Sequence, residues 1–282
     1  MSMPSKERSQ RSVLITGCSS GIGACVAHGL RERGYRVFAT ARQEADVQRL
    51  MSEGFESYLL DLTDSDTIAN ALEAVLYRTE GKLYALFNNG AYAQPGAVED
   101  LSRACLTASF ETNLFGWHDL TVRVLPIMRA QGYGRIIQNS SVLGFTALKY
   151  RGAYNATKFA LEGLSDTLRL ELHGSGIYLS LIEPGPIHSR INANALQAFE
   201  RWIDPQHSTH REHYVQQLPR LLDQQHAAYK LPPEAVLKRV IHALESDRPR
   251  RRYPVTMPTY LFSVLKRVAP TAFLDWMQIR VS

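Results

Sequence analysis

Cysteine is scarce in this 282-residue sequence. Cys18, Cys25 and Cys105 are an odd number, and no two of them have the spacing of a disulfide framework or a zinc site. Because secreted small domains depend on paired cysteines, the low count predicts a reduced, cytoplasmic setting.

Long apolar runs are also missing. The first twelve residues are polar and contain no signal-peptide core, so we expect residues 1–11 to be a flexible tail. The longest uncharged stretch near the end, 253–265, is interrupted by Pro254 and Pro258. It is shorter than the about 20 apolar residues of a membrane-spanning helix.

The charge is positive overall but not concentrated in a way that indicates nucleic-acid binding. The formal net charge is +5, and the tightest cluster consists of Arg248 and residues 250–252. No Lys/Arg-rich helix interleaved with aromatic residues follows it, so no nucleic acid is expected as a partner. Histidines between 187 and 230 form no HExxH or Cys/His pattern, so no metal site is expected and solvated side chains are the better interpretation.

Short apolar runs alternate with helical patterns along most of the chain. Continuous apolar strands indicate a sheet covered on both faces, and intervening helices indicate parallel strands. With no internal repeat and no linker, the sequence predicts one α/β domain over 1–282: a doubly wound Rossmann-type fold with a parallel sheet of about seven strands flanked by helices. Six strands are expected near 13–16, 36–40, 58–60, 83–87, 135–137 and 177–182, and helices near 23–33, 64–79, 101–130 and 152–173.

A glycine-rich loop follows the first expected strand. In Thr16-Gly17-Cys18-Ser19-Ser20-Gly21-Ile22-Gly23 the glycines allow a sharp turn and a close approach to a pyrophosphate. The helix that follows supplies free N–H groups and a favourable dipole at its N-terminus. On its own this spacing also fits an ordinary strand-to-helix turn.

A tyrosine and a lysine form the second candidate site. Tyr154 and Lys158 are four residues apart and share a helix face. A cation there favours the charged form of the phenol, which lowers its pKa toward the range of an acid/base catalyst. Ser140 and Ser141 follow an expected strand, at the end where ligands meet parallel sheets.

Together these motifs resemble the classical short-chain dehydrogenase/reductase family, in the same order and at similar intervals over residues 10–190. Two departures occur. Gly90-Ala91 is the reverse of the family's Ala-Gly, and Ser189 replaces a threonine; neither is expected to prevent activity. The matching residues are Thr16 to Gly23, Asp61, Asn88-Asn89-Gly90, Asn113, Ser141, Tyr154, Lys158 and Pro184-Gly185.

The resemblance implies a role for each catalytic residue. Tyr154 would be the general acid/base, Ser141 would hydrogen-bond the substrate oxygen, and Lys158 would hold the nicotinamide ribose and tune Tyr154. Asn113 would anchor a water that passes protons to Lys158. Asp61 would bind the adenine amine. The cofactor-binding residues would be Gly17, Ser19, Ser20, Gly21, Ile22, Gly23, Arg42, Asp61, Leu62, Asn89, Gly90, Tyr154, Lys158, Pro184, Gly185, Ile187 and Ser189.

The end of the second strand indicates the cofactor. NAD-dependent enzymes usually carry an acidic residue there, which accepts hydrogen bonds from the ribose 2′-OH and would repel a 2′-phosphate. This chain has Ala41 followed by Arg42, and a guanidinium makes charge-assisted bonds to phosphate. The sequence therefore predicts NADP(H); an exposed Arg42 without a ligand is the alternative.

Two further runs narrow the resemblance. Glu183 to Ile187 and Arg252 to Val255 resemble the retinol and hydroxysteroid dehydrogenase-like branch, most closely its bacterial members of the YbbO type. This implies hydride transfer between nicotinamide and an apolar aldehyde or ketone, or the corresponding alcohol. Metal is not needed, because Tyr154 and Ser141 can polarise the carbonyl.

Three other functions remain open. An NAD-linked alcohol dehydrogenase is disfavoured by Ala41 and Arg42. A catalytically silent NADP-sensing module would typically lack the tyrosine or the lysine. A sugar epimerase or dehydratase of the extended branch would carry a different glycine spacing and a larger C-terminal domain.

Two segments lie outside the matched motifs. Residues 187–230 are polar without a clear strand pattern, so we expect a substrate lid, with an inert and partly helical insertion as the alternative. Residues 258–282 carry apolar residues at helical spacing beside Lys266, Arg267 and Arg280. This stripe could rest on a membrane surface, but packing on the pocket or on a partner subunit is favoured. The resemblance also implies a homodimer or homotetramer through the two long helices.

Overall fold

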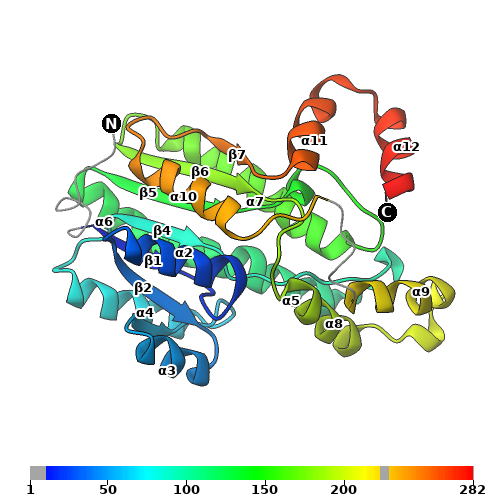
Figure 1. Cartoon of the computed structure of the whole chain (residues 1–282), viewed down its shortest axis with the longest axis horizontal. Coiled ribbons are helices and arrows are strands. Elements are labelled where there is room, and N and C mark those ends of the chain that lie inside the picture. The colour runs from blue at the N-terminus through cyan, green and yellow to red at the C-terminus, as the bar shows by residue number, and fades with distance from the viewer. Residues whose placement is uncertain (1–10, 223–228, 282) are drawn as a thin grey trace.

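Parallel strands form a single central sheet. The computed structural model describes residues 11–222 and 229–281, and the seven strands of its sheet lie in the order β3-β2-β1-β4-β5-β6-β7. From β1 the chain runs outward in one direction to β3 and then in the other direction from β4 to β7 (Figure 1), so the expected doubly wound α/β fold is confirmed. The strands are β1 (Ser12–Ile15), β2 (Arg36–Ala41), β3 (Glu56–Leu59), β4 (Ala85–Asn88), β5 (Gly134–Asn139), β6 (Ile177–Glu183) and β7 (Arg252–Pro254).

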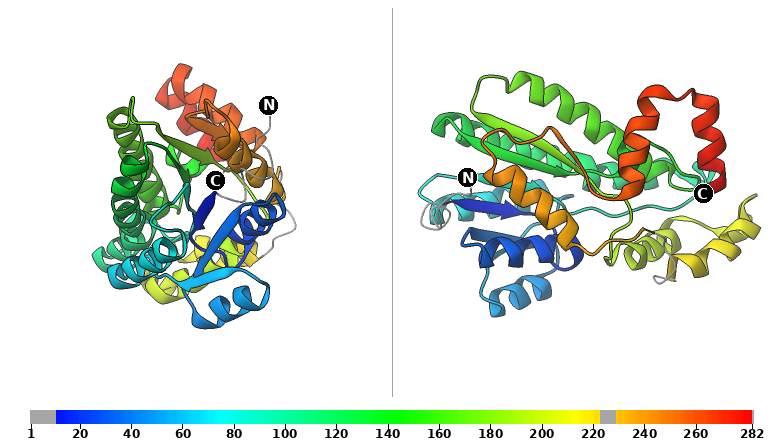
Figure 2. Two further views of the ribbon diagram at one scale, coloured as in Figure 1. Left: turned by 90° about the vertical axis from the view of Figure 1, so that its left-hand side faces the viewer. Right: turned by 45° about the horizontal axis from the view of Figure 1, so that its top comes forward.

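Helices cover both faces of the sheet, as the two views of Figure 2 show. Val13 and Ile15 of β1 pack into one layer, whereas Leu14 between them packs into the other. Both faces of the strand therefore need apolar residues, which explains its continuous apolar run. One face carries α2 (Gly21–Glu32), α3 (Glu44–Ser52) and α10 (Glu234–Glu245), and the other carries α4 (Ser65–Arg78), α6 (Gly116–Gln131) and α7 (Gly152–Glu171).

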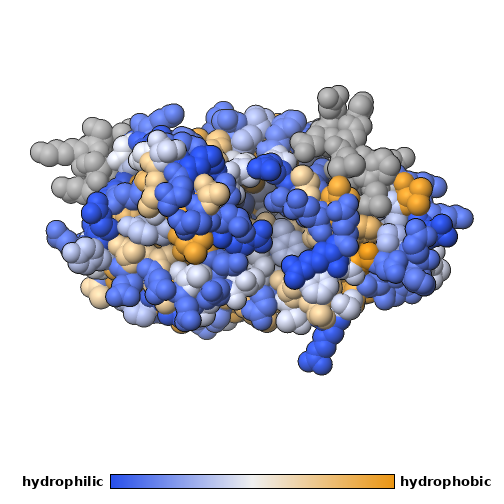
Figure 3. Space-filling model, turned by 90° about the horizontal axis from the view of Figure 1, so that it is seen from below, coloured by the Kyte–Doolittle hydropathy of each residue, from blue (hydrophilic) through white to orange (hydrophobic). Residues whose placement is uncertain are grey.

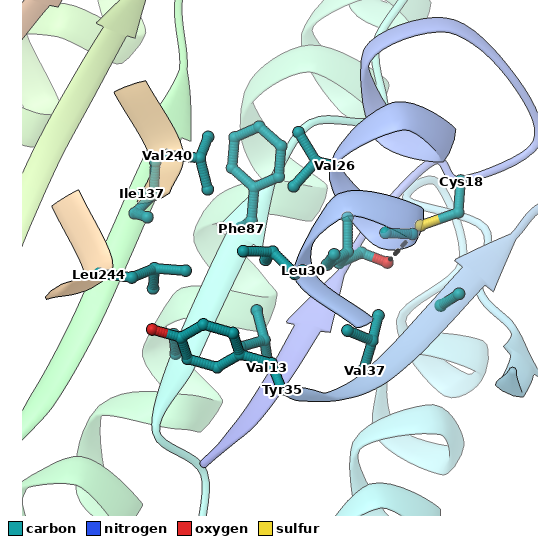
Figure 4. Packing of buried hydrophobic residues seen from close by; sticks show 14 of the residues in the cluster. Val13, Cys18, Val26, Leu30, Tyr35, Val37, Phe87, Ile137, Val240 and Leu244 are labelled. Carbon is teal, nitrogen blue, oxygen red and sulfur yellow. Dashed lines mark hydrogen bonds between the residues drawn. The ribbon is translucent and has the colours of Figure 1, made fainter. Parts of the chain in front are cut away.

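The first of these layers holds the glycine-rich loop against the sheet. Val26 and Leu30 of α2 pack with Phe87 of β4 and Val240 of α10 (Figure 4). Cys18, within the loop itself, is fully buried beside them, and burial raises the pKa of its thiol to about 12. This thiol therefore serves packing rather than nucleophilic chemistry.

The expected helix over 101–130 is not continuous. The structure has α5 (Arg103–Phe110), a π-helical turn η2 (Glu111–Phe115) and then α6. A π-helical turn inserts an extra residue and rotates the side chains that follow, and such turns often occur at functional sites. Here the turn contains the fully buried Asn113.

The polar segment 187–230 is more ordered than expected. It forms α8 (Ile191–Trp202), a 3-10 turn (Pro205–His207) and α9 (Arg211–Leu222). Its histidines are not all solvated: His210 Nε2 lies 2.5 Å from Glu99 Oε1, and the ring of His213 stacks on Tyr150. Residues 223–228 lie outside the described residues.

The last two described helices lie near the C-terminal ends of the strands (Figure 1). They are α11 (Met257–Val268) and α12 (Thr271–Val281), so the expected helical pattern is confirmed. Val264, Val268 and Trp276 are more than half exposed. Among the described residues, no helix is long and apolar enough to cross a membrane.

The N-terminal tail predicted over 1–11 falls mostly on residues 1–10, which lie outside the described residues. Arg11, however, belongs to the folded body. Its carbonyl accepts a hydrogen bond from the Arg36 backbone N–H, and its guanidinium lies over the ring of Tyr84. The face of the molecule that is seen from below Figure 1 is mostly hydrophilic, with scattered apolar residues (Figure 3).

Candidate active site

The glycine-rich loop joins β1 to α2 in a conformation that requires glycine. Gly17 has a φ of +71°, and a Cβ there would lie 2.6 Å from Gly90 Cα. A Cβ on Gly23 would lie 2.1 Å from Gly17 O. Ser20, the N-cap residue, makes no side-chain capping bond in the described structure. The N–H groups of the first turn of α2 are therefore left for a ligand.

Thr16 and Asn89 fix the loop to the neighbouring strand. Thr16 Oγ1 accepts the backbone N–H groups of Asn89 and Gly90 at 2.8 and 3.0 Å. Asn89 Nδ2 donates to the carbonyl oxygens of Thr16 and Gly17 at 3.0 and 3.1 Å. The exchanged Gly90-Ala91 pair places a glycine beside the loop, where a Cβ would lie 3.4 Å from Gly17 N and 3.1 Å from Leu62 Cδ1.

The end of β2 lies beside the loop. The Cys18 backbone N–H donates to Thr40 O at 2.8 Å. Ala41 is buried and Arg42 is exposed, and no acidic side chain among the described residues pairs with Arg42. A second arginine was missed by the sequence analysis: Arg49 of α3 donates to Ser19 O at 2.8 Å. The contact of Arg49 with the loop arises because α3 folds back onto the loop, which no sequence pattern indicates.

Asp61 and Leu62 follow β3. Asp61 Oδ1 accepts the backbone N–H and the hydroxyl of Thr63, both at 2.9 Å, which fixes the carboxylate. Leu62 packs against Gly90 and Gly116, where Cβ atoms would collide with it. These contacts give the far end of the cofactor-binding region a defined wall.

Ser141, Tyr154 and Lys158 meet at the end of β5. Ser141 begins the short turn η3 (Val142–Gly144) and accepts the Leu143 N–H at 3.1 Å. Tyr154 and Lys158 lie on the first turns of α7, and the Tyr154 hydroxyl hydrogen-bonds to Ser141. The Lys158 ammonium donates to Asn139 O at 2.8 Å and lies 4.2 Å from the centre of the Trp117 ring.

Burial dominates the protonation of these two groups. It raises the pKa of Tyr154 to about 12 and lowers the pKa of Lys158 to about 7. In this structure burial therefore outweighs the lowering of the Tyr154 pKa that was expected from Lys158. The ammonium lies 5.7 Å from the phenol ring centre and is directed to Asn139 O, so desolvation of the phenolate outweighs the nearby charge.

Asn113 supports the site from behind. Its side chain accepts the Tyr92 N–H at 3.1 Å and donates to Tyr92 O at 2.9 Å, and it also contacts Thr157 Oγ1 at 3.3 Å. The π-helical turn brings Asn113 against Thr157 of α7, and Thr157 lies between Tyr154 and Lys158 in the sequence. The water-anchoring role suggested for Asn113 stays a prediction.

The segment after β6 closes the site from the other side. Pro184 O accepts the Val142 N–H at 2.8 Å, which ties this segment to η3. Ile187 forms a parallel bridge with Leu231. Ser189 packs against the loop, since a Cβ on Gly21 would lie 3.0 Å from Ser189 Cβ.

One hydrogen-bonded path connects the loop to the lysine. Asn139 Nδ2 donates to Asn89 Oδ1 at 2.9 Å, Asn89 binds the loop carbonyls, and Asn139 O accepts from Lys158. The structure therefore brings together the glycine loop, Asn89, Ser141 and Lys158 at the same end of the sheet. In the described part of the chain, no group of three or more His, Cys, Asp or Glu residues is placed to hold a metal ion.

Comparisons with known proteins agree with this geometry. The family model for short chain dehydrogenase matches residues 11–199. An uncharacterized oxidoreductase of Escherichia coli K12, YbbO, is 43% identical over 94% of this chain and 93% of its own length. Human retinol dehydrogenase 8 is 30% identical over 92% and 85%, and human 17-beta-hydroxysteroid dehydrogenase type 1 is 33% identical over 86% and 77%.

A solved structure matches as well. A short-chain dehydrogenase from Streptomyces avermitilis has a TM-score of 0.78 and 26% identity, and the match covers 96% of this chain and 98% of that one. The chain belongs to the short-chain dehydrogenase family, with retinol and hydroxysteroid dehydrogenases among its relatives. It is accordingly an oxidoreductase acting on CH–OH or C=O groups with a nicotinamide cofactor and a small-molecule substrate.

Proposed function

We propose that this protein is an NADP(H)-dependent reductase of apolar aldehydes or ketones, working reversibly on the corresponding alcohols. The observation that carries this proposal is the path from the glycine loop through Asn89 and Asn139 to Lys158. It couples a phosphate-binding loop to a buried Ser-Tyr-Lys set at one end of the sheet, which is where open parallel sheets bind ligands.

The residues present fit a dinucleotide. Gly17 and Gly23 leave space in which a Cβ would collide with neighbouring backbone, and the uncapped first turn of α2 offers N–H groups to a pyrophosphate. Asp61 would bind the adenine amine, and Lys158 would bind the nicotinamide ribose. When bound, the cofactor supplies the hydride.

The protein's own residues handle the carbonyl oxygen and its proton. Ser141 and Tyr154 would donate hydrogen bonds to that oxygen and so stabilise the negative charge that develops there. With its pKa raised to about 12, Tyr154 is a protonated donor at neutral pH, and this suits reduction. Lys158 would offset the charge of the tyrosinate that remains.

Arg42 supports the preference for NADP(H). It follows the buried Ala41 at the end of β2, beside the loop, and it is exposed. A guanidinium there can bind a 2′-phosphate in a bidentate manner. Arg49 also contacts the loop, through Ser19 O, but its charge is paired with Asp46 and Glu53, so Arg42 is the arginine on which the preference depends.

Apolar side chains around the tyrosine support an apolar substrate. Tyr154 packs in a small cluster with Ala93 and Ala195, against which Leu143 and Ile191 also pack. A substrate carbon beside Tyr154 would therefore meet methyl and methylene groups of this cluster. Arg151, one turn before Tyr154, is the charged group that acts on the tyrosine. The retinol and hydroxysteroid dehydrogenases among the relatives act on molecules of that character by their names.

The proposal extends to the cellular setting and the oligomeric state of the protein. Cys18, Cys25 and Cys105 are free thiols, which agrees with a reduced, cytoplasmic setting. We also propose a homodimer or homotetramer in which α6 and α7 form the contact.

The test is an NADPH-consumption screen across aliphatic aldehydes, retinoids and steroid ketones of graded length, with Tyr154→Phe as the matched variant. Wild-type protein should oxidise NADPH with at least one apolar carbonyl compound. The variant keeps the ring but lacks the proton, so its kcat should fall by about 10²–10⁴-fold with near-normal folding and NADPH affinity. A variant that retained more than about a tenth of the wild-type kcat would place the acid elsewhere.

A further inference from the structure

A buried ion cluster joins the last strand to the helix that carries Tyr154 and Lys158. Arg252 of β7 donates hydrogen bonds from Nη1 to Glu162 and, at 2.6 Å, to Glu183. Its Nη2 donates to Asp166 at 2.8 Å. Glu162 and Asp166 lie on α7, and Glu183 ends β6. One guanidinium therefore ties three carboxylates from two elements to the edge of the sheet.

The cluster brings together the two sequence runs that indicate the retinol and hydroxysteroid dehydrogenase-like branch. Glu183 comes from one run and Arg252 from the other. β6 and β7 pair in parallel, with Glu183 opposite Pro254 and Leu181 opposite Arg252. The two sequence runs are therefore joined in the structure by the hydrogen bond between Arg252 and Glu183. This contact extends to α7 through Glu162.

Two of the carboxylates are inside the protein. Glu162 and Glu183 are buried, and burial raises the pKa of both, that of Glu183 to about 7. Although burial opposes its charge, the two glutamates raise the pKa of Arg252. Because three carboxylates face one arginine, the cluster carries a net negative charge even where Glu183 is partly protonated.

Lys158 is the nearby cation on which the charge of this cluster acts. Glu162 lies one helical turn beyond Lys158 and shares its face of α7. Glu162 also touches the turn that follows Ser141, because a Cβ on Gly144 would lie 2.8 Å from Glu162 Cγ. The carboxylate thus lies between the cluster and the proposed catalytic residues.

We propose that Glu162, held by Arg252, is a positioning residue for Lys158: its charge keeps Lys158 protonated and so sets the alkaline limit of NADPH binding and turnover. The proposal rests on the proposed role of Lys158 at the nicotinamide ribose. The direction of the interaction agrees, since Glu162 raises the pKa of Lys158 against the lowering caused by burial.

Few other charges face this pair. Lys158 meets the Tyr154 phenol on α7, the Trp117 ring of α6 and the carbonyl of Asn139 on β5. The groups facing Glu162 and the rest of its cluster are Asp166, Lys158 and Arg169 on α7, Ser140 directly after β5, Glu183 on β6, Arg252 on β7 and Arg267 on α11. Glu162 is therefore the anionic group one turn from Lys158.

The test is the pH dependence of NADPH affinity, measured by fluorescence titration of the full chain and then compared with the pH profile of kcat. In the wild type, affinity should fall on the alkaline side as Lys158 loses its proton. Glu162→Gln removes a stabilising negative charge, so the midpoint of that fall should move to lower pH by about 0.5–2 units. This range corresponds to a charge about 6 Å away at an effective dielectric constant between about 80 and 20.

Asp166→Asn is the matched control. It removes a carboxylate from the same arginine, but Asp166 is two turns from Lys158 and its side chain is 42% exposed, so its midpoint should stay at the wild-type value. If Glu162→Gln does not fold, Glu183→Gln should shift the midpoint in the same direction by a smaller amount. An unchanged midpoint in a folded Glu162→Gln protein, or equal shifts in both Glu162→Gln and Asp166→Asn, would overturn the proposal.

The binding measurement also separates this proposal from the proposed reaction. A shifted midpoint in a protein that reduces no carbonyl compound would leave the role of Glu162 standing and refute the reaction. If the protein reduces carbonyl compounds but Glu162→Gln leaves the midpoint unchanged, the proposed reaction stands and the proposed role of Glu162 is refuted.

Discussion

Asn139 shows how one side chain can align two parts of a site. Its amide nitrogen binds Asn89, which holds the glycine loop, while its carbonyl binds Lys158. It ends β5, the strand that leads into Ser140 and Ser141. A shift of this strand would therefore displace the loop and the lysine together.

Arg42 is the residue on which cofactor choice should depend. Arg42→Ala should weaken NADPH binding by about 1.5–3 kcal/mol, the range for hydrogen bonds to charged groups, and should leave NADH binding nearly unchanged. Isothermal titration with both cofactors measures this. Arg129→Ala, an exposed arginine on α6, controls for the change in net charge. Equal losses for NADPH and NADH would show that Arg42 is structural.

At the residue scale, the sequence was sufficient where a motif has fixed spacing. Tyr154 and Lys158 share a helix face by periodicity, and the glycine loop is identified by the order of its glycines. Arg49 and Glu162 were missed because their positions depend on how α3 and α7 pack against distant strands. No local pattern encodes those contacts.

At the scale of elements, the segment containing α8 and α9 is anchored at one point in particular. The Tyr214 hydroxyl bonds to Asp100 and accepts the Ala97 backbone N–H at 2.8 Å. Phe199 and Ile203 pack beside it. The anchor holds the segment to the turn Val98–Asp100 before α5, beyond the ends of the strands (Figure 1).

We expect residues 187–230 to act as a lid that tightens over substrate, since lids exclude water from the reacting centre. Protease nicking within this segment should slow when NADPH and substrate are both present. Tyr214→Phe removes the anchoring hydroxyl and should speed nicking of the free protein. Cleavage at the same rate with and without ligands would identify the segment as an inert insertion.

The terminal helices are the second element with an open role. Gln278 of α12 donates to Thr146 Oγ1 at 2.6 Å, close to the turn after Ser141. Because this contact holds α12 beside the site, we expect the apolar stripe of α11 and α12 to cover the pocket or a partner subunit. In flotation with anionic liposomes at low salt, where attraction is strongest, the protein should stay in the soluble fraction. Flotation that Lys266→Glu abolishes would instead demonstrate docking on a lipid surface.

The sequence predicted most of the long elements, but it placed no helix at α3 or α10 and missed the short or distorted elements. Six strands were located by their apolar runs, but β7 has three residues, one of them the ion-paired Arg252, so it lacks such a run. The π-helical turn at η2 inserts only one residue into a stretch that is helical on both sides, and hydrophobic spacing over the whole stretch therefore predicted a single helix.

At the scale of the whole molecule, the outer face of α6 and α7 has the character of a contact surface. Phe115 and Leu164 are 48% and 41% exposed, and a shallow hollow lies between the two helices. Its lining is mostly apolar: Leu114, Phe115, His118, Ala160, Gly163, Leu164 and Thr167. Specific interfaces bury about 1,600 Å² in total, an area that two long helices from each copy can supply.

Leu164→Arg should disrupt that contact, because a buried unpaired charge at an interface is costly. Light scattering coupled to size exclusion should find a dimer or tetramer for the wild type and a smaller species for the variant. Tyr77→Arg, on the strongly exposed face of α4, should leave the assembly unchanged. An unaltered mass for Leu164→Arg would move the interface elsewhere.

The late position of β7 in the chain has a consequence for biosynthesis. Arg252 is separated from Glu183 by 69 residues and from Glu162 by 90. Chains emerge from the ribosome N-terminal end first, at about 5–20 residues per second. For several seconds, therefore, α7 and β6 exist without the cation that their buried carboxylates require. We expect the nascent chain to remain loosely packed around α7 until residue 252 has emerged, so the active-site end of the molecule would be the last part to become rigid.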